Sequence, residues 1–383
     1  MPLDPRKLAW AELAHRALPQ RAVVELLRAF GDPEAVLAAS RAQLSRIVAQ
    51  GLADRVLAAA PRDGIDATVR WLEDPDHHLI AWDDPDYPRA LLDVGDAPPV
   101  LFHVGRRDLL NRPALAIVGS RNATPQGIAT GREFAAALCA AGLTIVSGLA
   151  EGIDAAAHSG ALDRATDAAA GSTIAVVGTG PDRVYPARNR DLAKRIASEG
   201  ALLSEYFPGT PARKENFPRR NRLISGLARG VLVVEATLSS GSLITARLAG
   251  EQGREVFAIP GSIHSPFSRG CHKLIREGAK LVETAQDVLV ELAWTPPRDS
   301  GSTAPGGTAS TMSGAAGAGA TAAEDVDATP LLRAMGYDSV AIDTLVLRTG
   351  LAAAEVTAEL VRLELDGRVA ARSGGLWQRL RRT

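Results

Sequence analysis

The sequence predicts a doubly wound, mostly parallel α/β sheet of the Rossmann-like type, with a small helical domain before it and a winged helix after it. Three observations support this prediction. Six short apolar runs, several rich in Val and Ile, recur between residues 114 and 261, and amphipathic segments separate them. Most of these runs end in Gly or Ser. On either side of this region, apolar residues recur at helical spacing.

Length and composition limit the kind of protein. At 383 residues the chain is longer than one ordinary domain, so we expect two or three domains. The formal net charge is −1, so any site for a polyanion must be a local patch. The 2 cysteines, Cys139 and Cys271, lie outside any metal-ligand spacing, so we expect no metal and a cytoplasmic location. We expect neither a signal peptide nor a membrane segment, because no uncharged apolar run is long enough.

Residues 1–75 are predicted to form a small helical, SAM-like domain. Apolar residues recur every three or four positions in AWAELAHRALPQRAVVELLRAFG and again in EAVLAASRAQLSRIVAQGLADRVLAAA. Gly31 and Asp32-Pro33 interrupt the pattern, so several short helices are expected. The GxG signature of a helix-hairpin-helix module is missing, which favours a packing role.

Residues 80–295 are predicted to form the Rossmann-like domain. Its expected strands are the apolar runs ALAIVGS, LTIVSG, TIAVVGTG, GALLSEY, GVLVVEA and EVFAIPG. Because these runs are almost continuously apolar, we expect helices to cover both faces of a parallel sheet. Ligands of such sheets bind where loops follow the carboxyl ends of the strands, so the polar residues after each run are the functional candidates.

Two further regions are predicted toward the C-terminus. Residues 296–326 are rich in Gly, Ala, Ser, Thr and Pro and are expected to form a flexible linker. Residues 327–383 contain a helix, a turn at Thr349-Gly350, a second helix over residues 352–365 and a hairpin near Gly374-Gly375, which is the pattern of a winged helix. The second helix carries more Glu than Arg, which favours contact with a protein over insertion into duplex DNA.

The first candidate site follows the run ALAIV. Gly119 permits a close backbone approach, Ser120 and the amides after it can hold an anion, and Arg121 can donate two hydrogen bonds to a phosphate. The segment lacks the GxGxxG pattern, and no acidic residue ends the second strand to hold a ribose. A dinucleotide cofactor is therefore not expected, and no other cofactor is indicated.

The second candidate is SGLAEGIDAAAHSGAL, residues 147–162. Asp154 and His158 are four residues apart on a predicted helix and can face each other. One interpretation is an acid–base pair. The favoured interpretation is a structural hydrogen bond that locks the loop, because no nucleophile lies nearby in the sequence.

Aromatic and basic residues lie together in GTGPDRVYPARNRDLAKR, residues 178–195. Tyr185 can stack a nucleobase while neighbouring cations such as Arg188 hold the backbone. Alternatively, Tyr185-Pro186 forms a turn against the sheet. Both interpretations stay open at this point.

The segment FPRRNRLISGLARGVLVVEA, residues 217–236, places cations before an apolar strand. Phe217-Pro218 predicts an extended approach to a helix, because the residue before Pro avoids helical dihedral angles. Arg219, Arg220 and Arg222 then begin that helix. Cations at a helix N-terminus oppose the macrodipole, so a bound anion is expected there.

A further anion-binding loop is predicted in VEATLSSGSLITA, residues 234–246. Small residues from Ser239 to Ser242 open a helix directly after a strand. Glu235, at the end of the strand, is expected to orient an arginine or loop amides rather than to act as a base.

Together these motifs resemble the DNA-processing protein A family (DprA, also called Smf). The resemblance rests on AIVGSRNATPQG, IVSGLAEGIDAAAHSGAL, GTGPDRVYPARNRDLA, FPRRNRLISGLARGVLVVEA, SGSLITARLAGEQGREVFAIPGS and SRGCHKLIREGAKLV, in that order over residues 80–292. It implies a DNA-binding protein that is not an enzyme. Members bind single-stranded DNA without sequence preference, protect incoming DNA during natural transformation, and load the RecA recombinase for recombination.

The resemblance also assigns residues to a DNA pocket and to a dimer contact. The segment CHKLIREGAKLV matches the part through which the family dimerises, so His272, Ile275 and Leu281 are candidates for a homodimer surface. The alternative is that Ile275 and Leu281 belong to the core. The implied residues of the pocket for single-stranded DNA are Gly119, Ser120, Arg121, Ser147, Gly148, Arg188, Asn189, Arg220, Asn221, Arg222, Ser240, Gly241 and Ser242.

Two other functions stay open. The same kind of sheet resembles nucleotide phosphoribohydrolases of the lysine-decarboxylase-like (LOG) family, although SSGSLITA stands where that family carries PGGxGT. In that case Glu235 and Asp154 are the plausible catalytic groups. A purely structural adaptor is the third possibility, but it leaves the arginines at the start of a helix unexplained.

Overall fold

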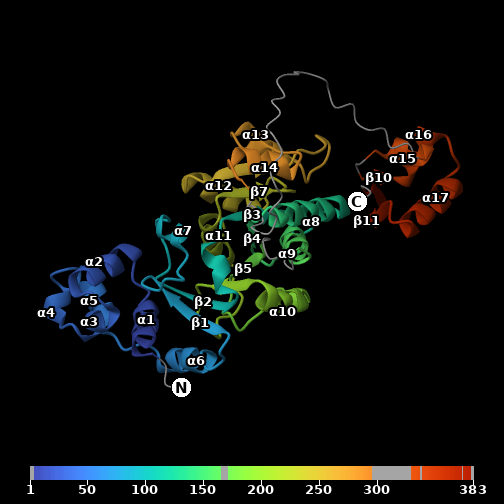
Figure 1. Ribbon diagram of the computed structural model, residues 1–383. Helices are drawn as coiled ribbons and strands as arrows, with labels where there is room; N and C mark the ends of the chain where they lie inside the picture. Colours follow the sequence, from blue (N-terminus) through green and yellow to red (C-terminus); the bar gives the residue numbers. More distant parts are fainter. Residues whose placement is uncertain (1–3, 165–170, 296–328, 337–338, 373, 381–383) are drawn as a thin grey trace, which may run out of the picture. The chain divides into compact units, whose positions relative to one another are not determined.

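The computed structural model describes residues 4–164, 171–295, 329–336, 339–372 and 374–380 (Figure 1). These residues form two compact units, which we describe separately: the N-terminal helices with the large sheet, and the C-terminal module. The predicted linker, residues 296–326, lies entirely outside the described residues. The domain boundaries given above stay a proposal.

Six helices precede the first strand, as the helical spacing predicts. Gly31, with a φ of 93°, ends the second helix, and Asp32 begins the third by accepting a hydrogen bond of 2.7 Å from the amide of Ala35. His15 stacks on Phe207 with ring centres 3.5 Å apart, so these helices pack directly onto the sheet domain. The helices are α1 (Pro5–His15), α2 (Gln20–Phe30), α3 (Pro33–Ala38), α4 (Arg41–Leu44), α5 (Gln50–Leu57) and α6 (Arg62–Trp71).

A sheet of nine strands forms the centre of this unit. The six predicted strands, β3 to β8, are all present and run parallel to one another. Strands that the apolar runs did not predict extend the sheet, with antiparallel β1 and β2 at one edge and β9 at the other. The strands are β1 (His77–Ala81), β2 (Val100–Gly105), β3 (Ala114–Val118), β4 (Thr144–Ser147), β5 (Thr173–Val177), β6 (Ala201–Ser204), β7 (Gly230–Val233), β8 (Glu255–Ala258) and β9 (Lys280–Leu281).

The strand order is β1-β2-β6-β5-β4-β3-β7-β8-β9, so the direction of winding reverses at β3. β4 pairs with one side of β3 and β7 with the other, both in parallel. At such a reversal the loops after neighbouring strands lead away from each other and leave room for a ligand. The fold therefore places the loops after β3, β4, β5 and β7 at one edge of the sheet.

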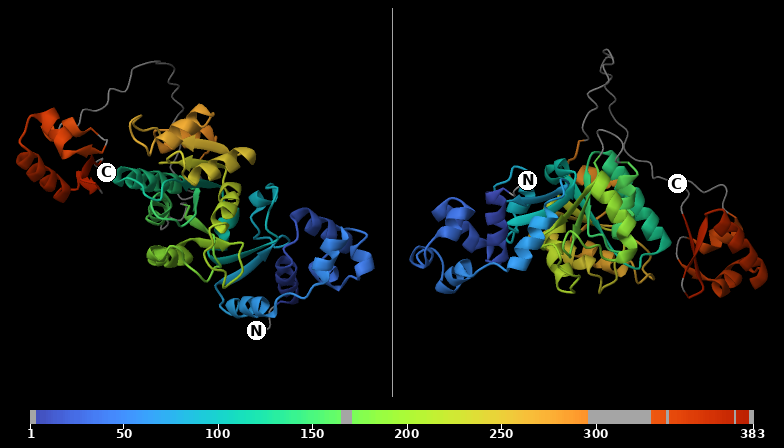
Figure 2. Two further views of the ribbon diagram at one scale, coloured as in Figure 1. Left: turned by 180° about the vertical axis from the view of Figure 1, so that it is seen from behind. Right: turned by 90° about the horizontal axis from the view of Figure 1, so that it is seen from below.

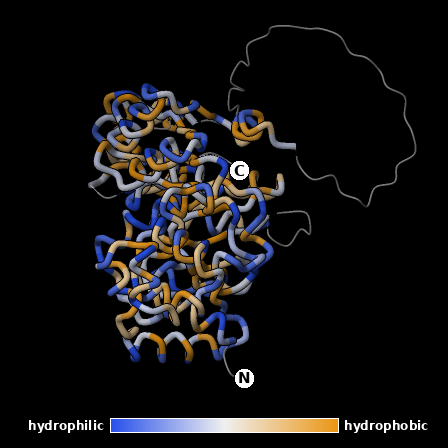
Figure 3. The backbone as a smooth tube through the Cα atoms, turned by 90° about the vertical axis from the view of Figure 1, so that its left-hand side faces the viewer, coloured by the Kyte–Doolittle hydropathy of each residue, from blue (hydrophilic) through white to orange (hydrophobic). Residues whose placement is uncertain are grey.

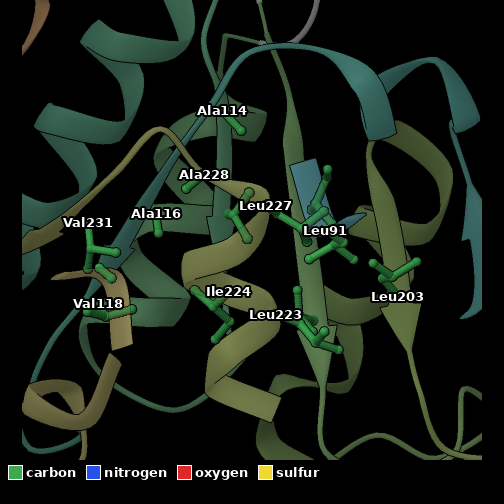
Figure 4. Packing of buried hydrophobic residues seen from close by; sticks show 14 of the residues in the cluster. Leu91, Ala114, Ala116, Val118, Leu203, Leu223, Ile224, Leu227, Ala228 and Val231 are labelled. Carbon is green, nitrogen blue, oxygen red and sulfur yellow. The ribbon is translucent and has the colours of Figure 1, made fainter. Parts of the chain in front are cut away.

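Helices cover both faces of the sheet (Figure 2). Side chains of β3 alternate between the faces: Ala116 and Val118 share a core with α11 and α12, whereas Leu115 and Ile117 share one with α8 and α9. In the first of these cores, α11 lies across the strands (Figure 4). The elements are α7 (Arg89–Leu92), η1 (Arg107–Asn111), α8 (Pro125–Ala140), α9 (Ile153–Leu162), η2 (Ala187–Asn189), α10 (Arg190–Glu199), α11 (Asn216–Leu227), α12 (Ser242–Glu251), α13 (Arg269–Arg276) and α14 (Ala285–Glu291).

Apolar stretches are short and alternate with polar ones along the chain (Figure 3). This alternation is the pattern of strands and amphipathic helices in a globular fold. Among the described residues, no helix is long and apolar enough to cross a bilayer.

The C-terminal unit is a winged helix, as predicted, with an antiparallel sheet of order β10-β12-β11. Gly350 ends α16 at the predicted turn with a φ of 71°, and Gly374 and Gly375 lie in the predicted hairpin with φ of 83° and 71°. The expectation that the acidic helix α17 contacts a protein stays a prediction. The elements are α15 (Pro330–Met335), β10 (Val340–Ala341), α16 (Ile342–Thr349), α17 (Ala353–Leu365), β11 (Val369–Arg372) and β12 (Leu376–Arg379).

Candidate phosphate-binding site

Loops from several elements meet at the carboxyl edge of the parallel strands. The loop after β3 is bound to the start of α9, because the amide of Ile153 donates to the carbonyl of Ser120 over 3.2 Å. Helix α11 reaches the loop after β4 through Arg220, and it reaches the loop after β5 through Asn216, whose Nδ2 donates to the carbonyl of Gly178 over 3.0 Å. The three loops and the first turns of α11 therefore form one surface.

The loop after β4, residues 148–150, is held by side chains from other elements, and we call it the clamped loop. Asp154 of α9 accepts hydrogen bonds from the amides of Gly148 and Ala150 over 3.1 and 3.3 Å. Asn189 of η2 donates from Nδ2 to the carbonyls of Leu149 and Ala150 over 2.9 and 3.1 Å. Leu149 has a φ of 60°, a left-handed conformation that a leucine rarely adopts without such constraints.

Arg220 of α11 completes the clamp. Its Nη2 donates to the carbonyl of Gly148 over 3.0 Å, and its guanidinium lies so close that a methyl group on Gly148 would overlap Nη1. The residue is buried, with 4% of its surface exposed. Burial lowers the pKa of Arg220 to about 10, against the opposing influence of Asp154, so the guanidinium stays charged at neutral pH.

A second guanidinium lies near the first. The charge of Arg121, on the loop after β3, is close enough to contribute to the lowered pKa of Arg220. Arg121 itself is exposed, and its Cζ lies 5.7 Å from the ring centre of Phe217. Because an anion beside both cations relieves their mutual repulsion, the site favours a negatively charged ligand.

The loop after β3 depends on small residues where it lies against α9. Gly152 has a φ of 75°, and a methyl group there would overlap the carbonyl of Ser120. A methyl group on Gly119 would lie 2.6 Å from Cγ1 of Ile153. The Oγ of Ser120 accepts a hydrogen bond of 3.2 Å from the amide of Asn122, which leaves its hydroxyl proton available to a ligand.

Tyr185 and Phe217 form an aromatic platform, whose Phe217 ring lies beside Arg121. Their ring centres lie 5.4 Å apart, and 49% of Tyr185 is exposed. The peptide bond between Tyr185 and Pro186 is cis. An exposed aromatic ring next to a guanidinium is a surface on which a nucleobase can stack. The stacking interpretation of Tyr185 therefore has the geometry that it requires.

The predicted extended approach to α11 is wrong. The helix begins at Asn216, so Phe217 and Pro218 lie in its first turn. Pro218 is tolerated there because the amides of a first turn have no partner within the helix. Three residues in this region are absent from the predicted site residues: Phe217, in the first turn of α11, and the exposed cations Arg213 and Lys214, which lie just before the helix. The signal in the sequence was an aromatic residue and two further cations within six positions before Arg219.

Some predicted site residues lie apart from the clamped loop or serve another purpose. Arg188 is exposed and pairs with Glu151, with Nε 3.2 Å from Oε1. Arg222 pairs with Glu205 instead, with Nη2 2.5 Å from Oε2. Ser147 donates a buried hydrogen bond of 2.7 Å to a carbonyl of the neighbouring strand. These three side chains are therefore already engaged with protein groups.

The small-residue loop before α12 forms a separate cluster. The Oγ atoms of Ser240 and Ser242 lie 2.7 Å apart, with Gly241 between them at the start of the helix. Asn221 is half-buried on α11. Among the described residues, no hydrogen bond joins these four residues to the clamped loop, so their place in the pocket stays a proposal.

Asp154 and His158 do not pair with each other. The Nδ1 of His158 donates to Oγ1 of Thr173 over 2.7 Å, and that hydroxyl donates in turn to the carbonyl of Ile145 over 2.8 Å. Burial lowers the pKa of His158 to about 3, whereas burial raises the pKa of Asp154 against the charge of Arg220 and the loop amides. Asp154 thus locks the loop, as the favoured interpretation predicts, and an acid–base couple has no geometric basis.

Glu235 follows β7, and its carboxyl group lies against the start of α8. A methyl group on Gly127, in the first turn of that helix, would overlap the carboxyl group of Glu235. The macrodipole favours a carboxylate at this position. Within the described ranges, no group of three or more His, Cys, Asp and Glu side chains is arranged to hold a metal ion.

The predicted dimer residues lie at the β9 end of the sheet. Nε2 of His272 donates to the carbonyl of Gly261 over 3.0 Å. Ile275 is half-buried and packs against the core, which agrees in part with the alternative that Ile275 and Leu281 are core residues. Leu281 does not fit that alternative, because 45% of it is exposed on β9.

Comparisons with known proteins agree with the fold. Residues 78–293 match the family described as DNA recombination-mediator protein A, and residues 315–375 match the DprA winged helix domain. Protein Smf from Escherichia coli (strain K12) is 43% identical over 330 residues, which cover 84% of this chain and 82% of that protein. DNA processing protein DprA from Streptococcus pneumoniae (strain ATCC BAA-255 / R6) is 52% identical over 205 residues, covering 54% of this chain and 71% of the relative.

Two solved structures are similar to this chain. The X-ray structure of DNA processing protein A from Streptococcus pneumoniae has a TM-score of 0.63 and 39% identity, and the match covers 73% of this chain and 95% of that one. A structure of DNA processing protein A from Helicobacter pylori has a TM-score of 0.51 and 31% identity, covering 57% of this chain and 95% of that one. The latter is described for the unique single-stranded DNA binding mode of that protein.

The buried, neutral His158 predicts sensitivity to acid. Because burial lowers its pKa from 6.5 to about 3, the folded protein binds fewer protons than the unfolded chain between these two pH values. The stability that this group contributes is complete above pH 6.5 and is lost as the pH falls toward 3. His158→Gln, whose amide can still donate to Thr173, should therefore retain about 2–3 kcal/mol more of its neutral-pH stability than the wild type does at about pH 4.5.

Thermal melts at neutral and acid pH check this expectation, with His264→Gln, at an exposed histidine, as the matched control. The control should follow the wild-type acid profile. If His158→Gln follows it too, the histidine is not the buried neutral group described here.

Proposed function

Because the chain belongs to the DNA-processing protein A (DprA/Smf) family, we propose that it binds single-stranded DNA without sequence preference. The proposed site is the edge formed by the loop after β3, the clamped loop and the first turns of α11. The Helicobacter pylori relative, described for its binding of single-stranded DNA, supports this class of ligand. The DNA-binding residues implied by the resemblance stand as the proposed pocket, except Arg222, whose guanidinium is already paired with Glu205. Tyr185, Phe217, Arg213 and Lys214 are added to them.

The observation that carries the proposal is the pair of guanidiniums at the carboxyl edge of the sheet. Arg220 is fixed and desolvated beneath Gly148, whereas Arg121 is exposed and free to donate two hydrogen bonds to a phosphate. The buried charge attracts the anion, and the exposed guanidinium binds it. Every nucleotide carries the same phosphate, so contacts of this kind position a strand without reading its sequence.

The aromatic platform supports single-stranded over duplex DNA. Stacking on Tyr185 or Phe217 requires the face of a base, which is covered by neighbouring bases in a duplex. Phe217 lies beside Arg121, and Tyr185 lies beside Phe217, so we propose that one nucleotide can place its phosphate on the guanidinium and its base on a ring. Such stacking tolerates any base, in keeping with binding that has no sequence preference.

The same geometry gives little support to the phosphoribohydrolase alternative. Asp154 is buried and already accepts hydrogen bonds from two loop amides, and Glu235 lies against the first turn of α8. Neither carboxylate is placed as an exposed acid or base beside Arg121. Incubation with nucleoside monophosphates tests this alternative directly, since release of free base would mean that the protein is an enzyme.

The cellular role that we propose is the one that the resemblance implies. The protein would act in the cytoplasm, protect single-stranded DNA that enters during natural transformation, and load the RecA recombinase onto it. The expected result is faster RecA filament formation on DNA coated with single-strand-binding protein. A rate unchanged by the protein would contradict the loading role and leave DNA binding intact.

We also propose a homodimer through the β9 edge of the sheet. β9 is the last strand in the sheet order, and Leu281 on it is 45% exposed. Ile263, in the loop after β8, and Val290, on α14, are 74% and 67% exposed. Exposed apolar side chains at an open sheet edge are typical of a surface that a second chain covers.

Arg121→Ala is expected to weaken binding of a labelled oligothymidine by about 1.5–3 kcal/mol, because a charged hydrogen-bond donor to phosphate is lost. The loss should be about equal for all DNA sequences. The dependence of the dissociation constant on salt should flatten by roughly one phosphate contact. Fluorescence anisotropy across a salt series measures both quantities.

Arg132→Ala is the matched control, because Arg132 is an exposed arginine of α8 whose Nη2 pairs with Asp163 over 2.6 Å. It should bind like the wild type. Wild-type affinity and salt dependence in Arg121→Ala would remove this edge of the sheet from the DNA-binding site.

Leu281→Arg is expected to give monomers, because a buried arginine at an apolar contact between two chains would lack a partner charge. Light scattering after size exclusion measures the mass. Leu57→Arg, at a residue of α5 that is 39% exposed, is the control and should keep the wild-type mass. An unchanged mass in Leu281→Arg would refute the proposed contact.

A further inference from the structure

We propose that Arg222 is a positioning residue: its buried ion pair with Glu205 sets the rotation of α11, so that Arg220 and Phe217 reach the DNA site. This inference rests on the proposed function. It separates Arg222 from Arg220, although the two residues stand in the same Arg-Asn-Arg segment. The role assigned to Arg222 is exerted through the helix and involves no contact with DNA.

The guanidinium of Arg222 is occupied by carboxylates. Its Nη2 lies 2.5 Å from Oε2 of Glu205, and its Nε lies 3.2 Å from Oδ2 of Asp96. The side chains of Arg222 and Glu205 are only 11% and 4% exposed. Burial by itself would lower the pKa of Arg222, but the charges of Glu205 and Asp96 reverse this and raise it. A guanidinium held in this way offers no surface to a phosphate.

The two arginines face opposite sides of the helix. Successive residues of an α-helix are about 100° apart, so residues two positions apart point in roughly opposite directions. Arg220 reaches Gly148, at the end of β4, whereas Arg222 reaches Glu205, directly after β6. Two contacts on opposite sides fix the rotation of α11 about its axis, as a single contact cannot.

Neighbouring contacts hold the same helix at the same place. Nε of Arg219 lies 3.4 Å from Oε1 of Glu205, so the carboxylate receives a second, more exposed cation. A methyl group on Gly226, one turn beyond Arg222, would lie 2.7 Å from Cγ2 of Val94, which shows how closely α11 packs against the segment after α7. Displacement of the helix therefore requires Glu205 to lose its partners.

Removal of Arg222 leaves Glu205 as a buried carboxylate with one exposed partner. A buried carboxylate without compensation is strongly unfavourable, so α11 must move or the carboxylate must take up water. Movement of α11 shifts Arg220 and Phe217, which lie on the same helix, and entry of water beside Glu205 loosens the packing that holds the helix in place. Removal of both charges leaves two neutral side chains that can hydrogen-bond to each other, and the helix can then stay in place.

The experiment compares Arg222→Gln, Glu205→Gln, the double variant Glu205→Gln/Arg222→Gln and, as the reference for the DNA site, Arg220→Gln. All are made in the full chain and titrated with labelled oligothymidine over a salt series. Arg222→Gln should lose roughly tenfold in affinity while the slope of log dissociation constant against log salt stays that of the wild type. The double variant should recover to within about threefold of the wild type with the same slope.

A phosphate contact by Arg222 gives a different pattern. The double variant would then stay as weak as Arg222→Gln, and both would show a slope reduced by about 0.7, the value for one phosphate on a single strand. That result overturns the inference, and so does wild-type affinity in Arg222→Gln. If Arg222→Gln does not fold, the double variant alone decides, because only the positioning role predicts that it binds with the wild-type slope.

Failure of the proposed function looks different again. The wild-type protein would then show no binding of oligothymidine, and the positioning role in DNA binding would fall with it. Melting temperatures of the same variants are a separate readout of the ion pair. The double variant should melt closer to the wild type than Arg222→Gln does.

Discussion

The candidate site depends on one buried charge, the guanidinium of Arg220. A desolvated cation without partners costs on the order of several kcal/mol, so the surroundings must compensate it. The carbonyl of Gly148 and the charge of Asp154 do so, and Asp154 also holds the amides of the clamped loop. The position of α11, the conformation of the loop and the start of α9 are thereby fixed together. If any one of them moves, the buried guanidinium of Arg220 loses a partner that compensates for its desolvation.

This constraint is the means by which a chain with a nearly neutral net charge would form the proposed phosphate site. The charge of the whole chain is −1, so long-range attraction of a polyanion is weak, and binding must come from local geometry. The fold supplies that geometry at the point where its strand order reverses. There Arg121 lies against Phe217 and Phe217 lies against Tyr185, with the charge of Arg220 nearby. In the proposed site, guanidiniums face phosphates and rings face bases, which are groups that every nucleotide possesses.

Much of the fold could be predicted from the sequence, because six apolar runs with small residues after them determine a parallel sheet and the edge at which the candidate site lies. Strands β1 and β2 are as long as the predicted strands, but histidines interrupt their apolar runs, as in HHLIA and VLFHVG, and β9 has only 2 residues. The extended form of Phe217 was wrong because Pro218 fits the first turn of a helix. The separation of Arg220 from Arg222 could not be foreseen, since it depends on Glu205 and on Asp96, which is 126 positions away.

The measurement that tests the account most directly is a crystal structure of the full chain with a short oligothymidine. The account predicts a phosphate within hydrogen-bond distance of Arg121, a base against Tyr185 or Phe217, and Arg222 still paired with Glu205. Oligothymidine ordered on the winged helix or on another face, with the edge around the clamped loop unoccupied at saturating DNA, would contradict it.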